Sequence, residues 1–324
     1  MQITGRMDPK GQANWAVAYP TIGIILLGGI SDPMRRRPLH LSAGIAYTSD
    51  DGRTMVRTRL FYASPRRGTV NGAEIDASSP RSPFRLIDRY AKYIDGAERV
   101  SFESENVNVI SGSSDGAAAA FGLCLSSASG GSLSLAEMED DLRMISESVG
   151  RSLFGGLTIT DPDKGLRTER LLDARDFSQY RIIACRFSEK RNPSDAIHSS
   201  VVRNSGYQKR VESTREKGRT LRELAASRDI EGIFELAMGD TDEYHRLVEA
   251  SGVHVITDGM RALMSRVREL RREVWCTYIV TGGTNVFVPA RKGDVPELVS
   301  ALEPMCSGVE VLRVAGPPHF SGPS

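Results

Sequence analysis

One segment constrains the fold of this chain more than any other. Residues 115–125 are almost all apolar and form a predicted helix without a polar face. Such a helix has to be covered on every side, so we expect it inside a folded domain. The run Ser111-Gly112-Ser113-Ser114 stands directly before it.

The Ser/Gly run has the chemistry of a phosphate-binding loop. A helix N-terminus offers unpaired N–H groups and a partial positive charge, and a glycine lets the backbone come close to a phosphate. The serine hydroxyls add donors and can ligate Mg²⁺. The spacing does not match GxxxxGK[ST], which excludes a P-loop. On composition alone, an ordinary Ser/Gly loop with a helix cap is the more common explanation.

The pattern of elements along the chain indicates an α+β protein. Short strand-like segments joined by Gly and Pro turns precede residue 110, whereas the second half is mainly helical with two late strands. Ser134 and Glu137 form a capping box, from which we expect a helix that continues to Val149. We predict domains at residues 1–180 and 181–324, with a ligand cleft between them.

Composition excludes several classes of protein. The 42 basic and 41 acidic residues give a net charge of +1, which argues against a nucleic-acid partner. The four cysteines and five histidines have no metal-ligand spacing, so we expect no bound transition metal. No apolar stretch approaches the roughly 20 residues that cross a bilayer. We therefore predict a cytoplasmic protein without a membrane partner.

Glu147 and Arg151 are a first candidate pair. They are four residues apart, and a solvated pair on a helix surface, worth about 0.3–0.5 kcal/mol, is one explanation. However, Arg151 begins a segment in which a helix must end and a strand begin. An arginine at such a junction can face a cleft and bind a carboxylate through two hydrogen bonds.

Two further segments have polar residues at turns. Arg191 precedes Asn192-Pro193, which we read as an N-cap followed by proline at the first helical position, and Ser194 follows. This helix start could bind a second anion or could be a simple cap. Residues 281–285 contain a glycine pair between two strands, which fits either a close backbone approach to a ligand or a plain hairpin.

Taken in order, these segments resemble the GHMP kinase superfamily, which includes galactokinase, homoserine kinase, mevalonate kinase and diphosphomevalonate decarboxylase. Residues 18–29, 111–120, 150–156 and 278–286 match four segments of the decarboxylases. The resemblance implies the two-lobed GHMP kinase fold. Its N-terminal half would be ribosomal S5-like, and its C-terminal half would be helix-rich and ferredoxin-like.

The departures from the decarboxylases narrow the resemblance. Thr281 stands at the position of their catalytic Asp, and Leu26 at the position of their Lys, whereas Arg151 is kept. The chain is more similar to the mevalonate 3-kinases of thermoacidophilic archaea, which share Ala-Tyr-Pro-Thr-Ile-Gly and Arg-Asn-Pro-Ser-Asp with it. This resemblance implies an ATP-dependent kinase, with Mg²⁺, that phosphorylates the 3-hydroxyl of (R)-mevalonate. It also implies a homodimer.

The resemblance gives each candidate residue a role. The loop would hold the nucleotide phosphates, Arg191 would stabilise the transferring group, Arg151 would hold the substrate carboxylate and Glu147 would orient a substrate hydroxyl. The implied residues are Glu147 and Arg191 for catalysis; Glu147, Arg151, Leu27 and Thr281 for substrate; Ser111, Gly112, Ser113, Ser114, Arg191 and Ser194 for nucleotide; and Ser113 for Mg²⁺.

Three alternatives remain open at this point. The first is ATP-dependent decarboxylation of a phosphorylated mevalonate, which needs a replacement for the missing Lys–Asp pair. The second is a kinase for the 5-hydroxyl or for mevalonate 3-phosphate, which needs an additional basic pocket for which Lys190 and Arg203 are candidates. The third is a nucleic-acid-binding module, which the net charge disfavours.

Overall fold

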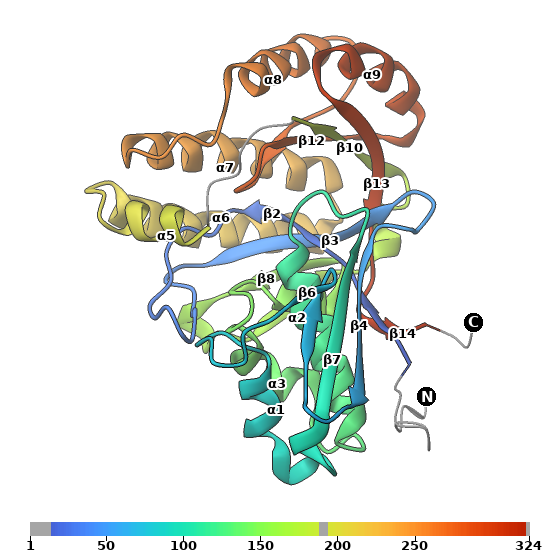
Figure 1. The fold of residues 1–324 in the computed structure, drawn as a ribbon. Coiled ribbons are helices and arrows are strands. Elements are labelled where there is room, and N and C mark those ends of the chain that lie inside the picture. Colours follow the sequence, from blue (N-terminus) through green and yellow to red (C-terminus); the bar gives the residue numbers. More distant parts are fainter. Residues whose placement is uncertain (1–13, 188–193, 322–324) are drawn as a thin grey trace.

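The computed structural model describes residues 14–187 and 194–321 (Figure 1). The first part of the chain forms β1 (Ala16–Ala18), β2 (Thr21–Ile25), β3 (Ser42–Ser49), β4 (Met55–Tyr62), β5 (Gly68–Val70), β6 (Ala73–Glu74), α1 (Phe84–Arg89), β7 (Val100–Val107), α2 (Ser113–Ala128), α3 (Leu135–Leu142), α4 (Gly150–Phe154), β8 (Leu157–Thr160) and β9 (Thr168–Leu172).

The remaining elements are richer in helix. They are β10 (Tyr180–Arg186), α5 (Ser194–Val202), α6 (Tyr207–Ser227), α7 (Ile230–Ala250), α8 (Asp258–Leu270), β11 (Ile279–Val280), β12 (Asn285–Arg291), α9 (Val295–Leu302), β13 (Gly308–Val314) and β14 (His319–Phe320). Strands and helices are present in both halves, so the predicted mixture of sheets and helices is confirmed. No helix in residues 14–187 or 194–321 is long and apolar enough to span a membrane.

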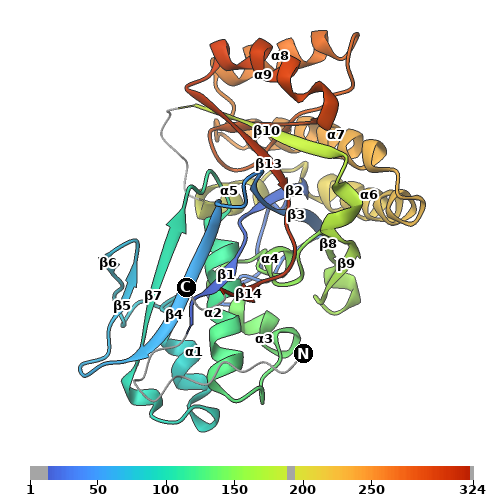
Figure 2. The same ribbon diagram turned by 90° about the vertical axis from the view of Figure 1, so that its right-hand side faces the viewer.

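Two sheets organise the described residues. One has the strand order β14-β1-β4-β7-β5-β6, and the other has the order β11-β12-β10-β13-β3-β8-β9, with β2 also paired to β3. Figure 2 shows β13 running between β10 and the β2–β3 region. Antiparallel pairing dominates; β5 and β7 are a parallel exception.

Both sheets cross the predicted domain boundary at residue 180. β13 pairs with β3 through Leu312 and Ser49, and β14 pairs with β1 through Phe320 and Ala16. Strands from the end of the chain are therefore hydrogen-bonded to strands from its beginning. The division into residues 1–180 and 181–324 stays a prediction.

Helix α2 has the environment that its composition predicts. It packs against β1, β4, α3 and α4, and Ala118, Ala119 and Ala120 are fully buried. A Cβ at Gly116 would lie 2.8 Å from Val56 of β4, so the glycine permits close packing of helix on sheet. At about 25 cal/mol per Å² of buried apolar surface, covering a helix on all faces stabilises it strongly.

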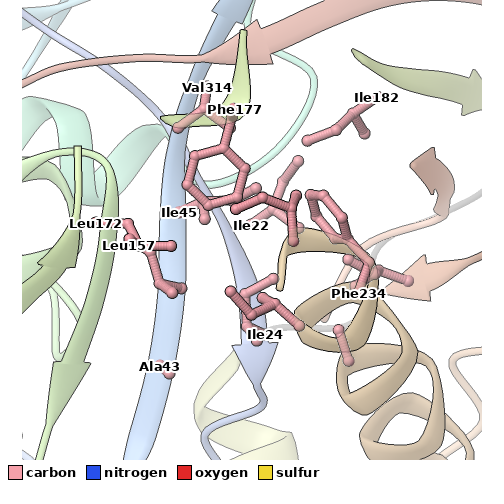
Figure 3. Packing of buried hydrophobic residues seen from close by; sticks show 14 of the residues in the cluster. Ile22, Ile24, Ala43, Ile45, Leu157, Leu172, Phe177, Ile182, Phe234 and Val314 are labelled. Atoms are coloured by element: carbon pink, nitrogen blue, oxygen red, sulfur yellow. The ribbon is translucent and has the colours of Figure 1, made fainter. Parts of the chain in front are cut away.

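A second apolar cluster joins the two halves behind the site. Ile22 and Ile24 of β2 pack with Ile45 of β3, with Phe234 of α7 and with Phe177, which precedes β10 (Figure 3). Because β2 is buried on both sides, the segment that follows it has little freedom to move. This cluster therefore holds the end of β2 where the site begins.

The predicted helix from Ser134 to Val149 was too long. The capping box between Ser134 and Glu137 is confirmed, but α3 ends at Leu142. The guanidinium of Arg143 bonds to the carboxylate of Glu139 and to the carbonyl of Leu166, and the chain leaves the helix there. Residues 143–149 form an irregular segment instead, in which the hydroxyls of Ser146 and Ser148 bond to Asp115 at the start of α2.

Candidate active site

A cavity of about 110 Å³ lies where the ends of several elements meet. The end of β2, the start of α2, the segment before α4, the start of α5 and the turn after β11 all contribute to its walls. Eight of the predicted site residues line it: Leu27, Ser111, Gly112, Ser114, Glu147, Arg151, Ser194 and Thr281. Ser113 is not among the lining residues, and Arg191 lies outside the described residues.

The phosphate-type loop is held firmly at one wall. The hydroxyl of Tyr47 donates to the carbonyl of Ser111 (2.6 Å) and accepts from its N–H (3.0 Å). Gly112 has a φ of 73°, and a Cβ there would lie 2.4 Å from the carbonyl oxygen of Thr21. Only glycine fits this position without strain. No side chain caps the start of α2, which leaves its first N–H groups available to an anion.

Asp115 is a buried carboxylate in the first turn of α2. Its side chain is 3% exposed and accepts hydrogen bonds from the hydroxyls of Thr21, Ser146 (2.5 Å) and Ser148 (3.0 Å). Burial raises the pKa of Asp115, although the positive charge of Arg151 opposes this shift. Donors to this carboxylate are thus neutral hydroxyls.

Arg151 presents a buried positive charge to the cavity. The residue is 8% exposed, and its side chain makes no ion pair or hydrogen bond with any residue that the structure describes. Its Nε and Nη2 atoms are inaccessible and unpaired. Burial lowers the pKa of Arg151, and Asp115 and Glu147 oppose that shift. An unpaired buried guanidinium is costly, so an anionic ligand beside it would be strongly favoured.

Glycines on two strands make room for this arginine. A Cβ at Gly44 of β3 would lie 2.5 Å from Cδ and 2.7 Å from Nε of Arg151. A Cβ at Gly23 of β2 would lie 3.6 Å from its Nη1. The side chain of Arg151 therefore packs against the strand backbone at both glycines, and a larger side chain at position 44 would displace it.

Glu147 is held on both carboxylate oxygens. Arg36 donates to Oε2 from Nε (3.0 Å) and Nη2 (2.8 Å), and His198 of α5 donates to Oε1 (3.0 Å). Burial alone would raise the pKa of Glu147, but the hydrogen bond from His198 and the charge of Arg36 outweigh it and hold the pKa well below its usual value. Glu147 is therefore an oriented anion. Arg151 is in α4 and does not pair with it, so the two are not a solvated helix pair.

His198 has a fixed orientation. Its Nδ1 accepts from the backbone N–H of Gly29 (3.0 Å), which places the ring proton on Nε2, toward Glu147. Asp195 on the same helix accepts from Nη1 of Arg36 (2.6 Å). Two residues of α5 are thus bonded to the network around Glu147.

The backbone after β2 is held by buried side chains. The N–H of Leu26 donates to Asp240 (2.7 Å), and its carbonyl accepts from Arg210 (2.8 Å). The carbonyl of Leu27 accepts from the hydroxyl of Tyr244 (3.1 Å). Arg210 and Asp240 also pair with each other, so the charges at this point are compensated. Leu26 and Leu27 both line the cavity as a result.

Thr281 closes the cavity from the second half of the chain. Its hydroxyl oxygen lies 3.4 Å from that of Ser111. The acidic residues among the described lining are Asp115 and Glu147, and no lysine belongs to that lining. A Lys–Asp couple of the kind found in the decarboxylases is therefore absent from the described walls.

Several residues that line or support the cavity could not be predicted from the sequence. Asp115 was visible only as part of a helix start, and Ser146 and Ser148 were assigned to a helix that ends earlier. Arg36 and His198 lie 111 and 51 residues from Glu147 and belong to no recognisable motif. A search for polar residues at predicted helix ends could have found Ser146 and Ser148.

The fold and the side chains that line the cavity define a small-molecule kinase or decarboxylase of the GHMP type. Residues 18–169 match the family model for the diphosphomevalonate decarboxylase-like N-terminal domain, and residues 192–295 match the model for the mevalonate-3-kinase C-terminal domain. The chain belongs to the mevalonate-3-kinase family. It is 42% identical over 309 residues to a mevalonate-3-kinase of Picrophilus torridus, which covers 93% of this chain and 95% of that one.

Solved structures agree with this assignment. A crystal structure of mevalonate-3-kinase from Thermoplasma acidophilum, with mevalonate 3-phosphate and ADP bound, matches with a TM-score of 0.90 and 40% identity over 97% of this chain and 100% of that one. Mevalonate diphosphate decarboxylase from Staphylococcus aureus matches with a TM-score of 0.82 and 17% identity over 96% and 98%. The second similarity is one of fold.

Proposed function

We propose that this chain transfers the γ-phosphate of ATP to the 3-hydroxyl of mevalonate and releases mevalonate 3-phosphate. The observation that carries the proposal is Arg151, a buried guanidinium at the cavity wall without an acidic partner among the described residues. A substrate carboxylate would supply the missing negative charge. The relatives at 42% identity bear the same activity in their names.

The nucleotide side of the cavity is the start of α2. Uncapped N–H groups there, together with the hydroxyls of Ser111 and Ser114, suit the β- and γ-phosphates. The serine hydroxyls are oxygen donors, the kind of ligand that Mg²⁺ takes. Residues 14–187 and 194–321 contain no cluster of three or more acidic, His or Cys side chains that could hold a metal ion. Mg²⁺ is usually held mainly by phosphates with one or two protein ligands. The hydroxyls of Ser113 and Ser114 are the candidates, and the bound ion would neutralise phosphate charge.

The substrate side follows from the opposite walls. Arg151 would bind the carboxylate, and Glu147, held in place by Arg36 and His198, would accept a hydrogen bond from a substrate hydroxyl. Leu27 and Thr281 would cover the rest of the substrate. Such positioning supplies most of the catalysis in phosphoryl transfer, because the transition state is loose.

Ser194 and Arg191 are the two remaining candidate residues, of which Arg191 lies outside the described residues. Ser194 is the first residue of α5 and lines the cavity. We propose that Ser194 helps to hold the nucleotide and that Arg191 stabilises the transferring phosphoryl group. Nothing in the described lining supplies the Lys–Asp couple of a decarboxylase, which favours phosphorylation without loss of CO₂.

One assay separates the kinase from its rivals. The protein is incubated with MgATP and mevalonate, and ADP, the phosphate ester and CO₂ are followed, the ester by phosphorus NMR. We expect stoichiometric ADP and a 3-phosphoester without CO₂. Release of CO₂ would instead show that the chain is a lyase. A 5-phosphoester would show that it phosphorylates the 5-hydroxyl of mevalonate. The homodimer and the cytoplasmic location remain predictions, the first testable by light scattering.

A further inference from the structure

The carboxylate of Glu147 has one oxygen that faces the cavity and one that does not. His198 lines the cavity together with Glu147, whereas Arg36 is absent from the described lining. Arg36 donates twice to Oε2, and Nε2 of His198 lies 3.0 Å from Oε1. Oε1 is therefore the oxygen on the cavity side, and it accepts fewer side-chain hydrogen bonds than Oε2 does. A carboxylate oxygen has two lone pairs, so Oε1 can accept a further donor from a ligand.

The ring of His198 is fixed from its other side. A backbone N–H can only donate, so its bond from Gly29 to Nδ1 (3.0 Å) requires that Nδ1 carries no proton. The ring proton is then on Nε2, toward Glu147. His198 is 6% exposed and lies on α5 between Ile197 and Val201, which are buried as well. The ring therefore relates the position of Oε1 to the position of the Gly29 backbone.

Buried side chains hold the backbone to which His198 is bonded. The carbonyl of Gly28 accepts from the hydroxyl of Tyr207 (2.8 Å), and its N–H donates to Nε2 of His40 (3.0 Å). These glycines directly follow Leu27, which lines the cavity. The segment thus gives His198 a fixed support close to the site.

We propose that a substrate hydroxyl binds Oε1 of Glu147 and that His198 is the positioning residue that holds this oxygen. Arg36 fixes Oε2 and compensates the charge. However, the last torsion of a glutamate side chain is broad, so a second donor is needed to fix Oε1. A displacement of about 1 Å in a reacting group can cost about 10²-fold in rate, which makes this orientation valuable. The inference rests on the proposed kinase function.

Two substitutions at position 198 separate the two bonds of the ring. His198→Gln places an amide N–H near the position of Nε2 and keeps the bond to Glu147, but it removes the acceptor for Gly29. His198→Asn places an amide oxygen near the position of Nδ1 and keeps the bond to Gly29, but it leaves Glu147 without this donor. Each variant loses one buried hydrogen bond, so we expect similar melting temperatures.

The kinetics of the two variants should differ. We expect His198→Asn to lower kcat about tenfold or more, because the acceptor hydroxyl is no longer well oriented. KM for mevalonate should stay nearly unchanged, since Arg151 still binds the carboxylate. His198→Gln should recover most of the lost kcat. Equal kcat in the two variants, or a loss that follows the melting temperature, would overturn the positioning role.

A double variant tests whether His198 acts through Glu147. His198→Asn combined with Glu147→Gln should have little lower kcat than Glu147→Gln alone, because the carboxylate that His198 positions is already replaced. Independent effects would multiply, and that result would contradict the inference.

A crystal structure of the wild-type protein with mevalonate decides the question if His198→Asn does not fold. A hydroxyl within hydrogen-bond distance of Oε1 is expected, and one bound to Oε2 instead would overturn the inference. Absence of ADP with the wild-type enzyme would refute the proposed function.

Discussion

A buried arginine without a partner lowers the stability of a folded chain, because its charge is removed from water without compensation. Arg151 is 8% exposed and unpaired among the described residues, whereas Arg143 is 2% exposed and bonded to Glu139. Desolvation of an ion costs several kcal/mol unless a partner compensates it. We infer that the charge of Arg151 serves to bind a ligand, whereas the charge of Arg143 stabilises the fold.

Arg151→Gln should therefore lose function without losing stability. We expect turnover to fall at least tenfold, about 1.4 kcal/mol of transition-state stabilisation, and the free energy of unfolding without ligand to stay equal or rise. Mevalonate should no longer raise the melting temperature. The matched control, Arg143→Gln, leaves Glu139 buried and should lower the free energy of unfolding by about 3 kcal/mol. Calorimetry on both variants checks this, and a large destabilisation of Arg151→Gln would contradict it.

Glu147 should contribute pH-dependent stability. Its folded pKa is lowered from 4.5, so the folded protein binds fewer protons than the unfolded chain at acid pH. The contribution is complete above the unfolded value and is lost as pH falls through the lower folded value. The difference in free energy of unfolding between wild type and Glu147→Gln should thus be constant near neutral pH and shrink below about pH 4. Urea titrations at several pH values measure it; a difference that grows on acidification would be the contrary result. The same variant should also lose at least tenfold in turnover.

At the scale of elements, Gly44 of β3 leaves the space that the side chain of Arg151 occupies. Gly44→Ala would bring a methyl carbon within 2.5 Å of the Arg151 side chain and 2.7 Å of the backbone oxygen of Ile22. We expect KM for mevalonate to rise at least tenfold, because the guanidinium is pushed from its position. Gly239→Ala in α7 has nothing within 4 Å of the added carbon and should stabilise the protein by about 0.5–1 kcal/mol. Steady-state kinetics and thermal unfolding of the pair test the contact.

Elements with strong local signals could be predicted from the sequence. The apolar run before residue 126 gives α2, and the Ser134–Glu137 capping box gives the start of α3. The end of α3 could not be predicted, because it depends on Arg143 reaching the carbonyl of Leu166 in a distant loop. The same is true of the site. The family resemblance predicted Glu147 and Arg151 as site residues, but not Arg36 or His198, which contact Glu147 only because of the tertiary fold.

At the scale of the whole molecule, the two halves share their sheet and so should unfold together. β13 lies between β10 and β3, with pairs such as Ile182 with Leu312 and Ser49 with Leu312. A fragment ending at residue 306 lacks this strand and exposes two strand edges. We expect it to lose cooperative unfolding by circular dichroism and to aggregate. A fragment with a sharp transition like that of the full chain would show that the halves fold independently.

The pairing of β1 with β14 has a practical consequence. Ala16 and Phe320 are neighbours in one sheet, so the two ends of the described chain emerge side by side (Figure 1). A short linker could join them, and the exposed turn at Gly130-Gly131, where an added side chain would meet nothing, offers a place to open the chain. The enzyme should accept circular permutation there, which would put new termini beside the helix that begins at the catalytic cavity.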